Sequence, residues 1–120
     1  MAANPFVILY VEDNDLVRES FAELLATSDR QVVSVPDGDS ARNALREQTV
    51  NLLMTDINLP DGSGLDLARE ALRQNPALPV IVCSGQDLRD VARSLGPTAH
   101  ALSKPFELEE LEALIERLMQ

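Results

Sequence analysis

The chain has 120 residues, of which 45% are hydrophobic and 25% charged, a balance typical of a folded domain rather than a disordered chain. Its formal net charge of −10 repels nucleic-acid backbones, and its longest apolar run, residues 6–11, is too short to cross a bilayer. The single cysteine, Cys83, excludes an internal disulfide, and no basic residue precedes the first apolar run as a secretory signal would require. We therefore expect one cytoplasmic domain over residues 1–120, with a core from about 5 to 119 and no direct contact with nucleic acid or membrane.

Apolar runs alternate with helical patterns from one end of the chain to the other. The first run is continuous and rich in β-branched residues, as in a strand that is buried on both faces. Five runs are predicted as strands, and they cover residues 6–11, 31–35, 52–56, 79–83 and 99–102. Each is followed by apolar residues at helical spacing, which predicts helices around residues 17–25, 41–45, 65–72, 86–95 and 107–119.

Polar side chains at turn positions predict where several helices begin. Asp37 or Asp39 is expected to cap the second helix. Ser63 is followed three residues later by an acid, as is Ser84, and this spacing predicts capping boxes at the third and fourth helices. Residues 59–62 have the composition of a turn.

Strict alternation of strands and helices predicts an α/β fold, a three-layer (βα)₅ arrangement with a parallel sheet between two layers of helices. Five strands are too few for a closed eight-stranded barrel, so the doubly wound strand order 2-1-3-4-5 is expected. In this order strands 1 and 3 are neighbours, and ligands bind beyond the carboxyl ends of the strands. The residues that follow the strands are therefore the candidates for function.

Three carboxylates follow the two strands that are expected to be neighbours. Glu12 and Asp13 follow the first strand, and Asp56 ends the third. Close carboxylates repel one another, and a hard divalent cation removes that repulsion, so this donor set predicts a Mg²⁺ site. A flavin phosphate is the alternative ligand, but it would need hydroxyls and backbone amides in the first loop, which is acidic.

Two further polar groups are expected at the same edge of the sheet. Ser84 follows the fourth strand, and Lys104, the only lysine among ten basic residues, follows the fifth. A carboxylate beside Mg²⁺ with an ammonium group opposite is suited to phosphoryl transfer, because both cations neutralise charge on the phosphoryl oxygens. Lysine presents a compact charge where arginine would impose a planar fork. Each residue alone could be a cap, a turn residue or a solvated surface group, but together they indicate a site.

These residues resemble the motifs of the receiver domain of two-component response regulators, which has a flavodoxin-like fold. The matching segments lie in order within residues 5–119, and they are Val11–Asn14, Asp56 with Leu59, Pro60 and Gly64, Ser84–Gly85, and Lys104–Phe106. The resemblance implies that Asp56 accepts a phosphoryl group from a sensor histidine kinase or a histidine phosphotransfer protein, and that the domain signals through phosphorylation-dependent protein contacts. It implies no enzymatic activity beyond the domain's own phosphorylation and dephosphorylation.

The resemblance also implies a set of metal ligands. Mg²⁺ would be bound by Asp13, Asp56 and the backbone carbonyl of Asn58, with Glu12 acting through a water molecule. A phosphatase with an aspartate nucleophile is a rival interpretation, but that class needs a second acid two residues after the nucleophile, where this chain has Asn58. A degenerate receiver that serves only as an interaction module is another rival, but it would lack an acid, Asp56 or Lys104.

The phosphoryl-binding groups implied by the resemblance are Ser84 and Lys104, and the Lys104–Pro105 peptide bond is expected to be cis. Two features depart from the family pattern. Ala101 stands where relatives often have a Tyr or Phe that moves as a switch, and the stretch 84–104 is slightly short. Because alanine has neither a ring nor a second rotamer, Ala101 cannot report phosphorylation in that way.

Overall fold

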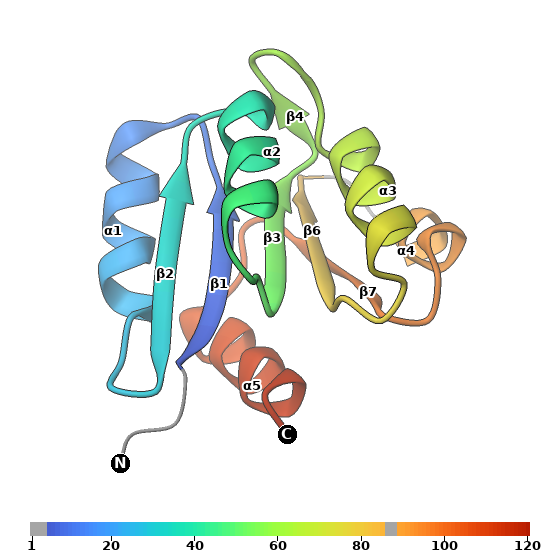
Figure 1. Ribbon diagram of the computed structural model, residues 1–120. Coiled ribbons are helices and arrows are strands. Elements are labelled where there is room, and N and C mark those ends of the chain that lie inside the picture. The colour runs from blue at the N-terminus through green and yellow to red at the C-terminus, as the bar shows by residue number, and fades with distance from the viewer. Residues whose placement is uncertain (1–4, 86–88) are drawn as a thin grey trace.

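Five parallel strands form the central sheet of the computed structural model, which describes residues 5–85 and 89–120 (Figure 1). In chain order these strands are β1 (Phe6–Val11), β2 (Arg30–Val35), β3 (Leu52–Asp56), β6 (Val80–Ser84) and β7 (Ala99–Ser103). Their order across the sheet is β2-β1-β3-β6-β7. The predicted order 2-1-3-4-5 is therefore confirmed, and the order reverses between β1 and β3.

Helices cover both faces of this sheet, which confirms the three-layer α/β prediction (Figure 1). They are α1 (Asp15–Leu25), α2 (Gly38–Glu47), α3 (Gly64–Gln74), α4 (Arg89–Leu95) and α5 (Leu108–Leu118). One apolar cluster joins the sheet to α2, α3 and α4, and a second joins the opposite face to α1 and α5. The three central strands, β1, β3 and β6, are buried on both faces because each face packs on helices, and this explains their continuous apolar runs.

The caps of two helices follow the sequence prediction in part. Asp37 caps α2, and its carboxylate accepts a hydrogen bond from the backbone N–H of Ser40 at 2.8 Å. Ser63 caps α3 by accepting from the N–H of Leu65 at 3.1 Å, whereas Asp66, three residues after Ser63, forms an ion pair with Arg69. The second predicted capping box needs Asp87, and the predicted start of the fourth helix is at Gln86; both residues lie outside the described part of the chain.

The turn predicted at residues 59–62 is present, and it closes a short two-stranded hairpin. Strands β4 (Asn58–Leu59) and β5 (Gly62–Ser63) pair in antiparallel register directly after β3. Gly62 has a φ of 149°, a backbone conformation that a side chain would strain. The hairpin connects Asp56, the last residue of β3, to the first residue of α3.

A buried arginine joins the start of β2 to α5. The Arg30 side chain is only 2% exposed and forms ion pairs with Glu112 at 2.8 Å and Glu116 at 2.7 Å. The strand begins at this residue, one position earlier than predicted, because Arg30 is the register partner of Phe6, the first residue of β1. Across residues 5–85 and 89–120, no helix is long and apolar enough to cross a membrane.

Candidate functional site

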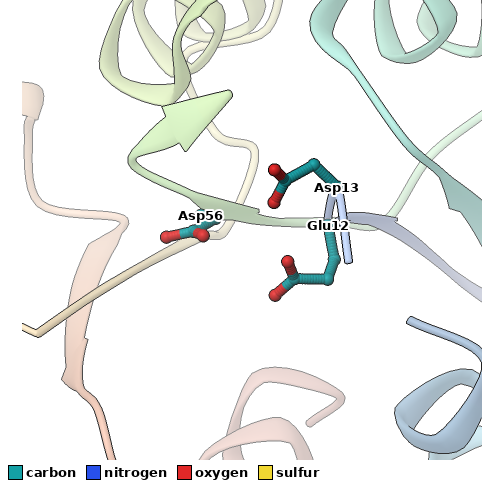
Figure 2. A group of neighbouring side chains, drawn as sticks. All are labelled: Glu12, Asp13 and Asp56. Carbon is teal, nitrogen blue, oxygen red and sulfur yellow. The ribbon is translucent and has the colours of Figure 1, made fainter. Parts of the chain in front are cut away.

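Three carboxylates meet where the strand order reverses. Glu12 and Asp13 directly follow β1, and Asp56 ends β3, the neighbouring strand, in which Thr55 pairs with Val11. One carboxylate oxygen from each of the three acids lies within 4.8 Å of the other two. Figure 2 shows the Glu12 and Asp13 carboxylates directed toward the side on which Asp56 lies. The structure thus brings together the three acids that the sequence placed at this edge.

The three acids differ in their surroundings. Glu12 is 4% exposed, and its carboxylate accepts a hydrogen bond from the N–H of Asn14 at 3.1 Å. Asp56 is partly buried, whereas Asp13 is exposed to solvent. Solvent therefore reaches the cluster at Asp13, whereas Glu12 is shielded from it.

Lys104 is the cation of this cluster. Its Nζ atom lies 3.2 Å from Asp56 Oδ2 and 3.4 Å from Glu12 Oε1. Burial disfavours the charged form of Lys104 and by itself would lower its pKa. The hydrogen bond to Asp56 and the attraction of Asp56 and Glu12 outweigh the effect of burial, so the pKa of Lys104 is raised. The ammonium group is therefore charged at physiological pH and offsets part of the repulsion among the acids.

The register of β6 with β7, in which Ser84 pairs with Ser103, places Ser84 and Lys104 at the same edge. Ser84 is buried at the end of β6, and its carbonyl oxygen accepts a hydrogen bond from the backbone N–H of Lys104 at 2.7 Å. The peptide bond between Lys104 and Pro105 is cis. Asn58 is exposed at the start of β4, two residues beyond Asp56. Ala101 lies in β7 and packs on the cluster shared with α2, α3 and α4.

An apolar cleft of about 570 Å³ adjoins the acids. It is bounded by Glu12, Asp56 and Lys104 on its polar side, and its apolar walls include Tyr10, Val17, Phe21, Met54, Cys83, Pro105 and Phe106. Burial raises the pKa of Cys83 to about 12, so its thiol stays neutral at physiological pH. Cys83 is the last residue of the predicted strand 79–83, and that position gives no sign that it borders this cleft.

Two residues that the sequence interpretation left without a role hold the backbone of Asp56. The Thr55 hydroxyl, which is fully buried, donates a hydrogen bond to the carbonyl oxygen of Asp56 at 2.8 Å. Gly64 lies against the same carbonyl, and its N–H donates to the carbonyl of Ile57 at 2.7 Å. The position of the Asp56 carboxylate is thus set by contacts on its own main chain as well as by β3.

Removal of one acid should stabilise the metal-free protein. We expect Asp13→Ala to raise the free energy of unfolding in EDTA by about 0.5–1 kcal/mol, because Asp13 repels Glu12 and Asp56 but is screened by solvent. Urea denaturation measures this change. Asp66→Ala is the matched control, since it removes an exposed acid that pairs with Arg69 and should give no gain. An Asp13→Ala protein less stable than wild type in EDTA would contradict repulsion among these acids.

Comparison with known proteins agrees with the sequence motifs. The chain matches the response regulator receiver domain family over residues 8–116. The response regulator receiver protein CpdR from Brucella abortus is 33% identical over 118 residues, which cover 93% of this chain and 95% of CpdR. The probable transcriptional regulatory protein TcrX from Mycobacterium tuberculosis is 31% identical over 119 residues. That match covers 97% of this chain but only 50% of TcrX, so the chain spans about half the length of this relative.

The structural comparison leads to the same family. The non-phosphorylated receiver domain of HemR from Leptospira biflexa superposes with a TM-score of 0.86 at 30% identity. The superposition covers 98% of this chain and 95% of the HemR domain. The family match includes all three acids and Lys104. The chain therefore belongs to the receiver domain family of two-component response regulators.

Proposed function

We propose that Asp56 accepts a phosphoryl group from a sensor histidine kinase or a histidine phosphotransfer protein in a reaction that depends on Mg²⁺. The observation that carries this proposal is the position of Asp56 between two other carboxylates and the Lys104 ammonium group, 3.2 Å away, at the carboxyl edge of the sheet. The phosphorylated domain would then signal through contacts with other proteins. The protein would catalyse only its own phosphorylation and dephosphorylation.

The donor atoms fit Mg²⁺. Glu12, Asp13 and Asp56 offer only oxygen ligands, within 4.8 Å of one another, and Mg²⁺ prefers oxygen and retains several waters. In the proposed site Asp13, Asp56 and the backbone carbonyl of Asn58 bind the ion directly, and buried Glu12 acts through a water molecule. When bound, Mg²⁺ neutralises charge on the carboxylates and on the phosphoryl oxygens.

The proposed reaction is a direct displacement at phosphorus. A carboxylate oxygen of Asp56 attacks in line, an O–P bond forms, and the N–P bond of the phosphohistidine breaks. The leaving nitrogen keeps the electron pair of that bond, and the histidine departs as neutral imidazole because its other ring nitrogen carries a proton. Lys104 and Ser84 would contact the equatorial phosphoryl oxygens, on which charge is concentrated.

Ala101 limits how this phosphorylation can be transmitted. The residue lies in β7 beside an open cleft of about 440 Å³ between α4, β7 and α5. Its methyl group has no alternative rotamer, so it cannot move into space vacated near Ser84. We therefore propose that any change in the surface around β7 arises from movement of backbone rather than from a rotating ring.

Intact-mass analysis tests the assignment of the acceptor. Wild-type protein incubated with acetyl phosphate and Mg²⁺ should gain one phosphoryl group, and EDTA or the substitution Asp56→Asn should abolish the gain. Asp66→Asn is the control, since it alters an exposed acid that is paired with Arg69 and lies outside the cluster. Full phosphorylation of the Asp56→Asn protein would show that the acceptor is another residue.

A further inference from the structure

Asp61, at the tip of the β4–β5 hairpin, is bonded to the first turn of α2. Its Oδ1 atom accepts from the backbone N–H of Gly38 at 2.9 Å, and its Oδ2 atom accepts from the N–H of Asp39 at 2.9 Å. Both carboxylate oxygens are used, so the contact fixes the orientation of the side chain as well as its distance. Figure 1 shows β4 near the end of α2 at which that helix begins.

These bonds complete the N-terminus of α2. The first four N–H groups of a helix have no partner within the helix. In α2 the N–H of Ala41 makes the first bond of the helix, to the carbonyl of Asp37, and the N–H of Ser40 bonds to the Asp37 side chain. Asp61 accepts from the N–H groups of Gly38 and Asp39, which have no partner within the helix. The same bonds lower the pKa of Asp61 and keep it ionised, and the positive end of the helix dipole favours this charge.

The base of the hairpin is fixed on the other side, close to the candidate metal site. The N–H of Ile57 donates to the carbonyl of Cys83 at 3.0 Å, and the N–H of Gly64 donates to the carbonyl of Ile57 at 2.7 Å. Between these anchors the hairpin has only two residue pairs, Asn58 with Ser63 and the pair that follows. A two-stranded ribbon of this length is not stable alone, so an anchor at its tip restrains Asn58 together with the anchors at the base.

We propose that Asp61 is a positioning residue, which holds the 58–63 hairpin on α2 so that the backbone carbonyl of Asn58 is set for the metal ion. This inference rests on the proposed function, because it needs Asn58 to be a ligand. Asp61 itself neither binds the metal nor touches the phosphoryl group. Residues that orient metal ligands typically change metal affinity by about 10- to 100-fold, and Asp61 acts on one ligand among several.

The test separates positioning from simple capping. Isothermal titration calorimetry with Mg²⁺ should give a dissociation constant about tenfold higher for Asp61→Ala than for wild type. Asp61→Asn keeps one carbonyl acceptor and should fall between them. Phosphorylation by acetyl phosphate at saturating Mg²⁺ should stay near the wild-type rate, since Asp61 lies outside the reacting groups. Hydrogen exchange at the amides of Gly38 and Asp39 should become faster.

Asp66→Ala is the matched control, because it also removes one exposed acid, which pairs with Arg69 on its own helix rather than with the hairpin tip or α2. If Asp61→Ala exposes the Gly38 and Asp39 amides but binds Mg²⁺ as tightly as this control, Asp61 is only a cap and the inference is wrong. If Asp61→Ala does not fold, Asp61→Asn decides by the same comparison. A wild-type protein that binds no Mg²⁺ would overturn the metal site itself, and with it this role of Asp61.

Discussion

Gly64→Ala is expected to lower the free energy of unfolding by about 3 kcal/mol, at the upper end of the range for overpacking a core. A Cβ atom at Gly64 would lie 2.0 Å from the carbonyl oxygen of Asp56 and 3.0 Å from Thr55 Oγ1. Asp56 cannot yield easily, because β3 is hydrogen-bonded on both sides, to β1 and β6. Without the overlap, alanine would be favoured over glycine within a helix by up to about 1 kcal/mol. A loss of unfolding free energy in Gly64→Ala would therefore show that the overlap outweighs this preference.

Urea denaturation of Gly64→Ala measures the loss, and Gly85→Ala is its control. A Cβ atom at Gly85 would meet no atom of residues 5–85 and 89–120 within 4 Å, so that substitution should change stability by less than about 0.5 kcal/mol. The Gly64 variant should also phosphorylate more slowly, because relief of the overlap moves the main chain of Asp56. If Gly64→Ala and Gly85→Ala were equally stable, the start of α3 would be able to move away from β3 with little loss of stability, and the expected effect of the overlap would be wrong.

Much of the fold and of the acid cluster was predictable because both follow from one property of parallel strands. Each buried strand is a short apolar run, and the first polar residue after it marks the carboxyl edge of the sheet. This rule locates Glu12, Asp56 and Ser84 from the sequence alone. Their convergence required only the strand order, and right-handed crossovers between alternating strands and helices leave few alternatives to it.

The side-chain contacts that join distant elements were not predictable, because they connect residues far apart in the sequence. Asp61 meets Gly38 across 23 positions, and Arg30 meets Glu112 across 82. Asp61 stands in a segment with the composition of a turn, where aspartate is common. The sequence therefore does not indicate that Asp61 also contacts helix α2. Strands β4 and β5 have two residues each, which is too short for any hydrophobic period to appear.

Lys104→Met is expected to slow phosphorylation of Asp56 by roughly 30-fold, which corresponds to about 2 kcal/mol for the loss of a hydrogen bond between charged groups. The Nζ atom lies 3.2 Å from Asp56 Oδ2. From this position it can donate a hydrogen bond to a phosphoryl oxygen and stabilise the negative charge on it during the transfer.

The same substitution should leave the affinity for Mg²⁺ unchanged or increase it, since the ammonium group repels a cation at the three acids. Rates from intact-mass time courses at saturating Mg²⁺, together with calorimetric titration of the metal, measure both effects. Lys104→Arg is the control: it keeps the charge but replaces a compact ammonium group with a planar fork, so it should recover only part of the rate. A wild-type rate for Lys104→Met would show that the charge near Asp56 serves the resting protein alone, by offsetting Glu12 and Asp56, and takes no part in the transfer.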